Sequence, residues 1–409
     1  MSEFKTRLHS VPSGGFLTDR DKDKKPILDV RELGIDFGGL TAVDNFNLMI
    51  GRNEIAGLIG PNGAGKTTVF NLLTNVYQPT RGSILIDGMP TAGKKTYQVN
   101  RMGVARTFQN IRLFKELSVI DNIKVGLHES MKYNLASSLL RMPNYWKEEK
   151  QCTERALELL DIFHMADLAN AQAGSLPYGA QRRLEIMRAL ATSPKLLLLD
   201  EPLSNLDAKL RIDMRAELQR LHKELGTTII YVTHDQTEAL TMSTKIALFK
   251  AGELNQVATP TELYNNPIDL EAADFIGNPR INLLDGKAEV INGQLVVKSD
   301  LGGHTFPAEH LTSEEFPKSG EFDCVLAIRP EQIAISTQPV EGAIPVTIYA
   351  NQPAGSETIT TLKAGTDEFL AKDIGQIRYD LDQKVWAIID QDKINIYNKE
   401  TTRLIKRAV

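Results

Sequence analysis

A glycine-rich run between an apolar segment and a helical one constrains the fold of this chain more than any other feature. It follows Ile55–Ile59, which is typical of a buried strand, and precedes a helical pattern at Val69–Leu73. Its spacing, G-x-x-x-x-G-K-T, is that of a phosphate-binding P-loop, and its residues are Gly60, Pro61, Asn62, Gly63, Ala64, Gly65, Lys66, Thr67 and Thr68. Loop N–H groups and the helix N-terminus would hold the phosphates.

Each polar residue of this loop has an expected role. Lys66 would reach the β- and γ-phosphates of a nucleotide, and Thr67 would ligate Mg²⁺. The alternative is a glycine-rich turn that binds nothing. The strand before the loop and the helix after it favour the nucleotide site, because the motif requires that context.

Bulk composition bounds the partners and the number of domains. The chain has 409 residues, which favours two or three domains. A net charge of −5 gives no reason to expect nucleic acid as a partner. Two cysteines, far apart in the sequence, fit a reduced, cytosolic compartment. Residues 1–25 are polar and are expected to form a mobile tail. No stretch is long and apolar enough to span a bilayer, so any membrane role would come through a partner.

After this tail, the pattern of apolar and polar residues divides the chain into segments. Residues 26–259 alternate strand and helix patterns, as in a parallel α/β domain. A helix is expected from Asp207 to Leu225, with Gly226 as its stop. Residues 110–175 lack strand signals and are expected to form a helical insertion. Residues 260–409 carry short strand patterns and an Asn292-Gly293 hairpin signal, which indicate a small β-barrel.

Two carboxylates end a second buried strand pattern, Leu196–Leu199. Asp200 is expected to hold Mg²⁺, through water, and Glu201 to act as general base on the attacking water. The alternative is a surface Asp-Glu pair that closes a strand, which is weak beside a P-loop. His234 follows the next strand pattern and could bond the γ-phosphate, and Gln109 could touch both Mg²⁺ and water.

These residues together resemble the ATP-binding subunits of ABC transporters. Lys66, Gln109, Asp200 with Glu201, and His234 match, in order, the family's Walker A, Q-loop, Walker B with catalytic glutamate, and H-loop. The signature motif corresponds to Leu176, Pro177, Tyr178, Gly179, Ala180 and Gln181, and the D-loop to Ser204–Asp207. Phe37 stands where the family's adenine-stacking aromatic stands. The resemblance implies an α/β P-loop NTPase fold with a helical insertion, followed by a small barrel of the OB or TOBE type.

One position departs from the family pattern. Pro177 replaces the usual serine of the signature, which removes one hydroxyl donor to the γ-phosphate. The backbone N–H groups of Gly179 and Ala180, at a helix start, could still bind an anion. Proline just before a helix is also structurally well placed.

The two parts of the chain resemble different importers. Up to about Pro202 the chain resembles the ATPases of branched-chain amino-acid importers, for example over Arg106–Phe114 and the tyrosine-containing signature. From Leu203 onward it resembles those of sugar and glycerol-3-phosphate importers, for example over Leu203–Arg211 and Ile328–Glu331. Our hypothesis is a chimeric or recombined chain with its seam at Asp200–Pro202.

The resemblance implies ATP and Mg²⁺ as cofactors and a head-to-tail dimer with a second ATPase subunit, identical or related. It also implies membrane permease subunits, an indirect solute-binding protein, and a peripheral position at the cytoplasmic face of the inner membrane. Two alternatives stay open. One is a soluble ABC ATPase of repair or translation, and the other is a hybrid that binds ATP and docks nowhere.

Overall fold

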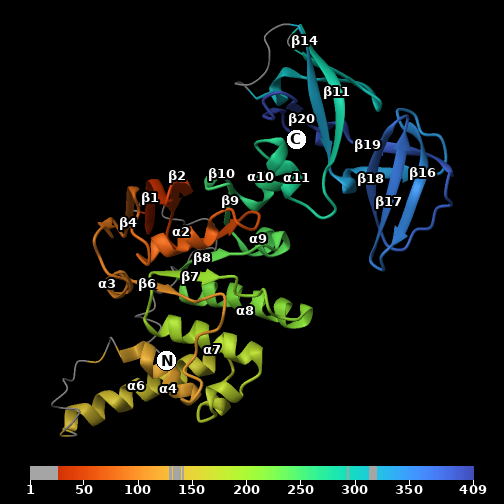
Figure 1. Ribbon diagram of the computed structural model, residues 1–409. Helices are drawn as coiled ribbons and strands as arrows, with labels where there is room; N and C mark the ends of the chain where they lie inside the picture. Colours follow the sequence, from red (N-terminus) through yellow and green to blue (C-terminus); the bar gives the residue numbers. More distant parts are fainter. Residues whose placement is uncertain (1–25, 129–130, 132–139, 141, 293, 313–319) are drawn as a thin grey trace. The chain divides into compact units, whose positions relative to one another are not determined.

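The computed structural model describes residues 26–128, 131, 140, 142–292, 294–312 and 320–409 (Figure 1). The chain divides into two compact units, with the boundary between Pro260 and Thr261. The expected tail over residues 1–25, and Gly293 of the hairpin signal, lie outside the described residues. Among the helices that are described, none combines the length and the apolar character needed to cross a membrane.

A six-stranded sheet with the order β10-β9-β3-β8-β7-β6 is the centre of the first unit. All neighbouring strands are parallel except β10, which runs antiparallel to β9 at the edge. The strands are β3 (Ile55–Ile59), β6 (Val104–Arg106), β7 (Leu196–Asp200), β8 (Thr228–Val232), β9 (Lys245–Lys250) and β10 (Glu253–Ala258). The strands expected at β3, β7 and β8 are confirmed, and every residue in them is buried.

Helices cover both faces of this sheet, and alternate residues of β7 show it. Leu196 and Leu198 join a hydrophobic cluster with Val69 and Phe70 of α2, whereas Leu197 and Leu199 join a second cluster with residues of α7 and α8. The helices of this unit are α2 (Lys66–Leu73), α3 (Thr96–Arg101), α4 (Val119–Leu127), α6 (Pro143–Ile162), α7 (Tyr178–Ala191), α8 (Ala208–Leu225) and α9 (Gln236–Met242).

The helix expected between β7 and β8 is confirmed as α8. Asp207 is its N-cap, and its side chain accepts a hydrogen bond from the Leu210 N–H. Gly226 ends the helix at φ 61°, a left-handed conformation that glycine adopts without steric cost. The 18 residues of α8 therefore return the chain from β7 to its parallel neighbour β8.

The expected helical insertion is also present, with α4 and α6 and the short 3₁₀ turns η2 (Ala166–Leu168) and η3 (Ala173–Ser175). Its entry and exit lie side by side. The Val119 N–H donates to the Ala171 carbonyl, and the Ala173 N–H donates to the Leu117 carbonyl. The segments at which the chain enters and leaves the helical insertion are thus hydrogen-bonded to each other.

A four-stranded antiparallel sheet, order β2-β1-β4-β5, is the part of the first unit that the sequence pattern missed. Its strands are β1 (Leu28–Phe37), β2 (Leu40–Ile50), β4 (Arg81–Ile86) and β5 (Met89–Pro90). The apolar run Ile84–Ile86 predicts only the end of β4. Register shifts interrupt the pairing of β1 with β2 at three places, and each shift breaks the alternation that signals a strand.

The second unit begins at the second residue of the short helix α10 (Pro260–Asn265), which is followed by α11 (Leu270–Phe275) and by two antiparallel sheets. The first sheet contains β11 (Asn282–Ile291), β12 (Gln294–Ser299), β13 (Gly302–Phe306), β14 (Glu321–Ile328), β20 (Asn395–Asn398) and β21 (Leu404–Lys406). The second contains β15 (Ile333–Ser336), β16 (Ile344–Pro353), β17 (Glu357–Ala364), β18 (Asp367–Ile374) and β19 (Lys384–Ile389). The described part of this unit also contains 3₁₀ turns: η4 (Ala308–His310) lies between β13 and β14, whereas η5 (Pro330–Gln332) and η6 (Gln391–Lys393) lie where the chain passes from one sheet to the other.

The second of these sheets gives the unit its barrel character. Its order is β15-β19-β16-β17-β18, and the two outer strands, β15 and β18, contact each other, so the sheet curls on itself. The expected hairpin is present as well, because Ile291 of β11 lies opposite Gln294 of β12. Asn292 has φ 50°, the sign that a primed turn requires.

Candidate active site

The glycine-rich run lies between β3 and α2, at the carboxyl end of a buried parallel strand. Two of its glycines are required by close packing. A Cβ at Gly60 would lie 1.9 Å from the Phe249 carbonyl oxygen, and one at Gly65 would lie 2.7 Å from the Ala42 oxygen. Gly65 is also the N-cap of α2, at φ 102°. The loop therefore delivers the first N–H groups of α2 to the sheet edge, where an anion can accept from them.

Lys66, the first residue of α2, is buried and turns back over the loop. Its ammonium donates to the carbonyl oxygens of Gly60 and Pro61, each at 2.8 Å. Burial lowers the pKa of Lys66, and the charges of Glu201 and Asp200 oppose that shift. The ammonium is thus close enough to both carboxylates for their fields to act on it. Thr67 is exposed in the same turn.

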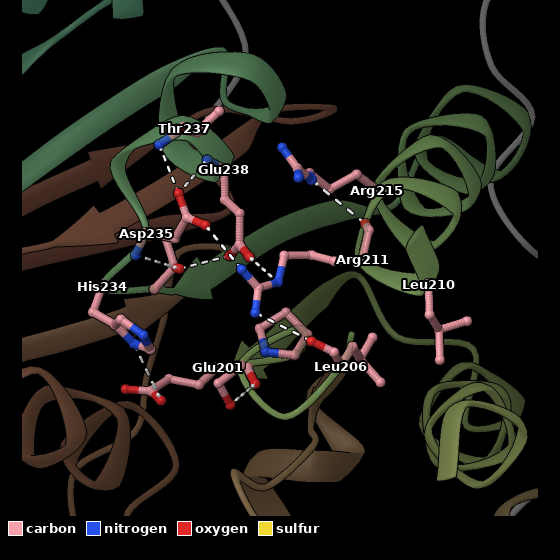
Figure 2. A network of polar contacts seen from close by, with 12 residues as sticks. Glu201, Leu206, Leu210, Arg211, Arg215, His234, Asp235, Thr237 and Glu238 are labelled. Atoms are coloured by element: carbon pink, nitrogen blue, oxygen red, sulfur yellow. Dashed lines mark hydrogen bonds and ion pairs between the residues drawn. The ribbon is translucent and has the colours of Figure 1, made fainter. Parts of the chain in front are cut away.

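Two predicted residues from separate segments converge on one carboxylate oxygen of a third, Glu201. Oε2 of Glu201 accepts a hydrogen bond from Nε2 of Gln109 at 3.1 Å and lies 3.5 Å from Nδ1 of His234. The His234–Glu201 contact is drawn in Figure 2. The Glu201 side chain is 16% exposed, so water can reach a carboxylate that protein groups already orient. That is the arrangement a general base needs.

Backbone geometry explains how Glu201 reaches this position. It directly follows β7, has φ 42°, and its N–H donates to the Val232 carbonyl of β8. The turn away from strand geometry separates the Glu201 side chain from that of Asp200, which stays in the strand and is buried. The two carboxylates therefore occupy different surroundings, although they are neighbours in the sequence.

Asp200 has a partner that sequence reasoning missed. Nη2 of Arg106, at the end of β6, lies 2.7 Å from Oδ2 of Asp200, and both side chains are less than 10% exposed. Nη1 of the same guanidinium donates to Oδ1 of Asn71 on α2 at 2.7 Å. Parallel pairing of β6 with β7 makes the contact possible, because it places Arg106 beside Leu198. An arginine three residues before Gln109 was the available signal.

A second missed residue is Arg182 of α7. Its guanidinium is 1% exposed and donates to the backbone carbonyl oxygens of Phe108, Asp200 and Pro202. It also pairs with Glu185 at 2.5 Å. One side chain thus connects the signature helix to the segment before Gln109 and to both ends of the Asp200-Glu201 turn.

The signature residues contact the D-loop in the same chain. The Tyr178 hydroxyl accepts from Nδ2 of Asn205 at 3.2 Å, and a Cβ at Gly179 would lie 2.4 Å from a methyl of Leu210. The Gln181 amide donates to the Leu176 carbonyl. Pro177 is the N-cap of α7 and makes no side-chain cap, so the first N–H groups of this helix, at Tyr178, Gly179 and Ala180, are available to an anion.

Phe37 ends β1, is 42% exposed, and packs edge-on against Tyr77 with ring centroids 5.3 Å apart. The sequence reasoning named Phe37 and missed Tyr77, which follows α2. Two exposed aromatic rings in contact make a larger apolar surface than the single ring that was expected, and such a surface suits a flat, stacked ligand.

Comparison with known proteins identifies the family. A profile described as ABC transporter matches residues 43–204. The Xylose/arabinose import ATP-binding protein XacJ of Haloferax volcanii is 33% identical over 387 residues, which cover 91% of this chain and 94% of that protein. The chain belongs to the family of ABC transporter ATP-binding proteins.

Two further relatives cover the first part of this ABC protein. The High-affinity branched-chain amino acid transport ATP-binding protein BraF of Pseudomonas aeruginosa is 40% identical over 248 residues, or 61% of this chain and 97% of its own. The solved structure of cbiO1 from Clostridium perfringens, part of the ABC transporter complex cbiONQ, superposes with a TM-score of 0.52 at 27% identity. It covers 59% of this chain and 91% of its own.

These matches confirm a likeness of the first part of the chain to branched-chain amino-acid importer ATPases, and they show that nearly the whole chain resembles a sugar importer ATPase. The aligned stretch with BraF, 248 residues, is longer than the 202 residues up to Pro202, so that similarity continues beyond the expected seam. The seam at Asp200–Pro202 stays a prediction. In the structure Leu199 and Leu203 share one hydrophobic cluster, so the two sides of that position belong to a single core.

Proposed function

We propose that this chain is the ATP-hydrolysing subunit of an ABC importer and works as a head-to-tail dimer on membrane permease subunits. The observation that carries the proposal is the convergence of Gln109 and His234 on the Glu201 carboxylate, beside the buried ammonium of Lys66. This cluster combines a phosphate-facing cation with an oriented base, the two groups that ATP hydrolysis requires.

The residues present fit ATP with Mg²⁺. Thr67 offers a hydroxyl, Asp200 a carboxylate and Gln109 an amide oxygen, and hard oxygen ligands are those that Mg²⁺ prefers. Among the described residues no three His, Cys, Asp or Glu side chains gather as a metal site made of protein alone would need. This agrees with a cation whose remaining ligands are phosphate oxygens and water. When bound, Mg²⁺ would neutralise charge on the β- and γ-phosphates.

The chain's own residues would divide the work as follows. Lys66 would exchange its two carbonyl partners for phosphate oxygens, and the N–H groups of α2 would complete the cradle. Glu201 would take a proton from the attacking water, while Gln109 and His234 hold the carboxylate in place. Phe37 with Tyr77 would receive the adenine ring.

The signature segment, Tyr178 to Gln181, would act on a nucleotide bound to a second subunit. Each chain carries one P-loop and one signature, so a two-fold pair has two complete sites. Moving such a pair from mostly open to mostly closed needs about 5 kcal/mol of differential affinity. Charge-assisted contacts to the γ-phosphate from both subunits can supply that energy.

A groove beside the Q-loop offers the place for a permease. It has a volume of about 610 Å³ and is lined by residues of α3, β6, α4 and α7 and of the segment between β6 and α4. Its lining includes Arg112, Phe114, Val125, Arg188 and Thr192. Since Arg112 and Phe114 follow Gln109 closely in the chain, a permease helix bound there would be displaced when the catalytic cluster moves. We propose the cytoplasmic face of the inner membrane as the site of action.

The proposed solute is a branched-chain amino acid or a sugar. The groove lies in the part of the chain that BraF covers, which favours the amino acid. The second candidate, a sugar, is favoured by XacJ, whose match extends over the barrel unit. We propose residues 26–259 as the ATPase domain and residues 260–409 as a regulatory domain.

The test combines three measurements on the full chain: ATP hydrolysis, the oligomeric state with ATP and magnesium, and co-purification of permease subunits. We expect hydrolysis, ATP-dependent pairing and a captured permease, and we expect Lys66→Ala to lose ATP binding and pairing. Hydrolysis without a permease would favour the soluble ATPase. Binding of ATP with neither pairing nor capture would favour the unproductive hybrid.

A further inference from the structure

Arg211, in the first turns of α8, bridges two loops of the site (Figure 2). Its Nη2 donates to the Leu206 carbonyl of the D-loop at 3.2 Å. On the other side, Nη1 lies 3.6 Å from Oδ2 of Asp235, and Nε lies 3.9 Å from Oε1 of Glu238. One guanidinium therefore joins the segment before α8 to the start of α9.

The segment that Arg211 reaches is the one that carries His234. Asp235 is the N-cap of α9, and its Oδ1 accepts from the N–H groups of Thr237 and Glu238. The Asp235 N–H donates to the Thr233 hydroxyl, which in turn donates to Glu238 at 2.6 Å. Both chain neighbours of His234 are thus tied to the first turn of α9, so a shift of that turn moves His234.

The charges around Arg211 allow its contacts with Asp235 and Glu238 to persist when these groups move by small distances. Burial raises the pKa of Glu238 above its usual value, and the hydrogen bond from Thr233 and the charge of Arg211 oppose part of that shift. The Arg211 side chain is 31% exposed, and its two ion pairs are longer than hydrogen bonds. A long-range attraction of this kind tolerates small displacements that would break a bidentate pair.

We propose that Arg211 is a positioning residue that transmits the position of the D-loop to His234, and so sets the contact of His234 with Glu201. This rests on the proposed function. Two loops would then move together: when the D-loop shifts, Arg211 draws Asp235 and the first turn of α9 with it. In this scheme Arg211 itself contacts neither the nucleotide nor the attacking water.

The kinetic test compares Arg211→Ala with Arg211→Lys and Asp235→Asn in the full chain. We expect kcat to fall about tenfold in Arg211→Ala with ATP affinity unchanged, because only the orientation of His234 is lost. Lysine should restore part of the rate. Asp235→Asn keeps the helix cap and removes the charge. Its decrease in kcat should therefore resemble that of Arg211→Ala.

Epistasis with His234 separates positioning from a general structural effect. In a His234→Ala background, Arg211→Ala should lower kcat no further, since its target is already absent. The matched control is Arg220→Ala, an arginine of the same helix that pairs with Glu224 at 3.7 Å and is 44% exposed. It should leave kcat unchanged. Additive losses, or an unchanged kcat in Arg211→Ala, would overturn the proposal.

A readout without turnover distinguishes this failure from that of the proposed function. The chain has seven histidines, so the imidazole resonance of His234 can be assigned by comparison with His234→Ala. We expect it to shift in Arg211→Ala and to stay in place in Arg220→Ala. A shifted resonance in a chain that hydrolyses no ATP would support the coupling and reject the proposed function. An unmoved resonance would reject the coupling itself.

Discussion

Two buried arginines of the first unit reach carboxylates, and Arg182 also donates to backbone carbonyls, whereas two buried cations of the second unit are held by backbone carbonyls. In the first unit, Arg106 and Arg182 pair with the carboxylates of Asp200 and Glu185, at 2.7 and 2.5 Å. In the second, Lys406 is fully buried and donates to backbone carbonyls of Gln391, Asp392 and Ile394, while Phe306 packs its ring 4.8 Å from the ammonium.

Arg329, also in the second unit, repeats the pattern of Lys406. It donates to the carbonyls of Tyr264 and Ile276 and stacks on the Tyr264 ring at 4.2 Å. Because backbone carbonyls are part of the helices and their ends, these hydrogen bonds hold α10, α11 and β14 together. Carboxylates can exchange partners with water, metal or phosphate. The barrel thus uses buried charge for rigidity, and the ATPase unit keeps part of its buried charge available for chemistry.

The largest effect, on the rate of ATP hydrolysis, is expected when the charge of the Glu201 carboxylate is removed. Glu201→Gln is expected to lower the hydrolysis rate by about 10²- to 10⁴-fold, the usual contribution of a general base. ATP binding should persist, because the Lys66 cradle is intact. Phosphate release and nucleotide titration measure the two effects. Glu321→Gln, an exposed carboxylate of the second unit, is the control. A Glu201→Gln protein that hydrolyses at the parental rate would remove Glu201 from this role.

The next effect tests whether buried pairs of the first unit also carry stability. Arg182→Met should destabilise by about 3–5 kcal/mol, because Glu185 would keep a buried charge without its partner. Urea unfolding followed by helix circular dichroism measures it, since the long helices lie in this unit. Arg183→Met is the matched neighbour: its pair with Glu217 is partly exposed, and its loss should be about 1 kcal/mol or less. Equal losses would contradict the assigned difference.

Lys406 provides a pH test of the second unit. Burial lowers the pKa of Lys406 from 10.5 to about 8 in the folded protein. The folded state therefore binds fewer protons than the unfolded one between these values, so stability should rise with pH from about 8 to 10.5 and should be level, at its lower value, below about 8. The shift corresponds to about 3 kcal/mol.

The measurement is urea unfolding followed by Trp386 fluorescence in a Trp146→Phe background, which leaves one tryptophan, on β19. The parent should gain stability relative to Lys406→Met across this pH window, with ATP hydrolysis unaffected by the substitution. A parent and a variant with parallel pH profiles would show that burial does not lower the pKa of Lys406.

The smallest effect concerns an exposed contact of the first unit. Tyr178→Phe removes the hydrogen bond from Asn205, and we expect a loss of about 0.5–1 kcal/mol, since water replaces the partner. The same urea assay measures it, with the exposed Tyr349→Phe of the second unit as control. A loss as large as that of Arg182→Met would mean that the signature and D-loop contact is a structural support.

Local patterns predicted much of this molecule because they act over a few residues. The P-loop, the buried strands β3, β7 and β8, the cap and stop of α8 and the β11–β12 hairpin all follow from spacing, apolar runs or turn chemistry. The β1–β2 sheet did not, because its register shifts hide the period of two. Arg106, Arg182 and Arg211 were missed as site residues, since arginines on strands and helices carry no distinctive spacing.

The order of residues along this chain was enough to predict the family, which is confirmed, and to predict the nucleotide loop and the base, because motif chemistry depends on short spacings. Folding decided which partners those groups have. Glu201 meets Gln109 and His234, and Asp200 meets Arg106, only because parallel pairing brings the carboxyl ends of β6, β7 and β8 to one edge. Contacts of this kind join residues far apart in the chain, and no local pattern encodes them.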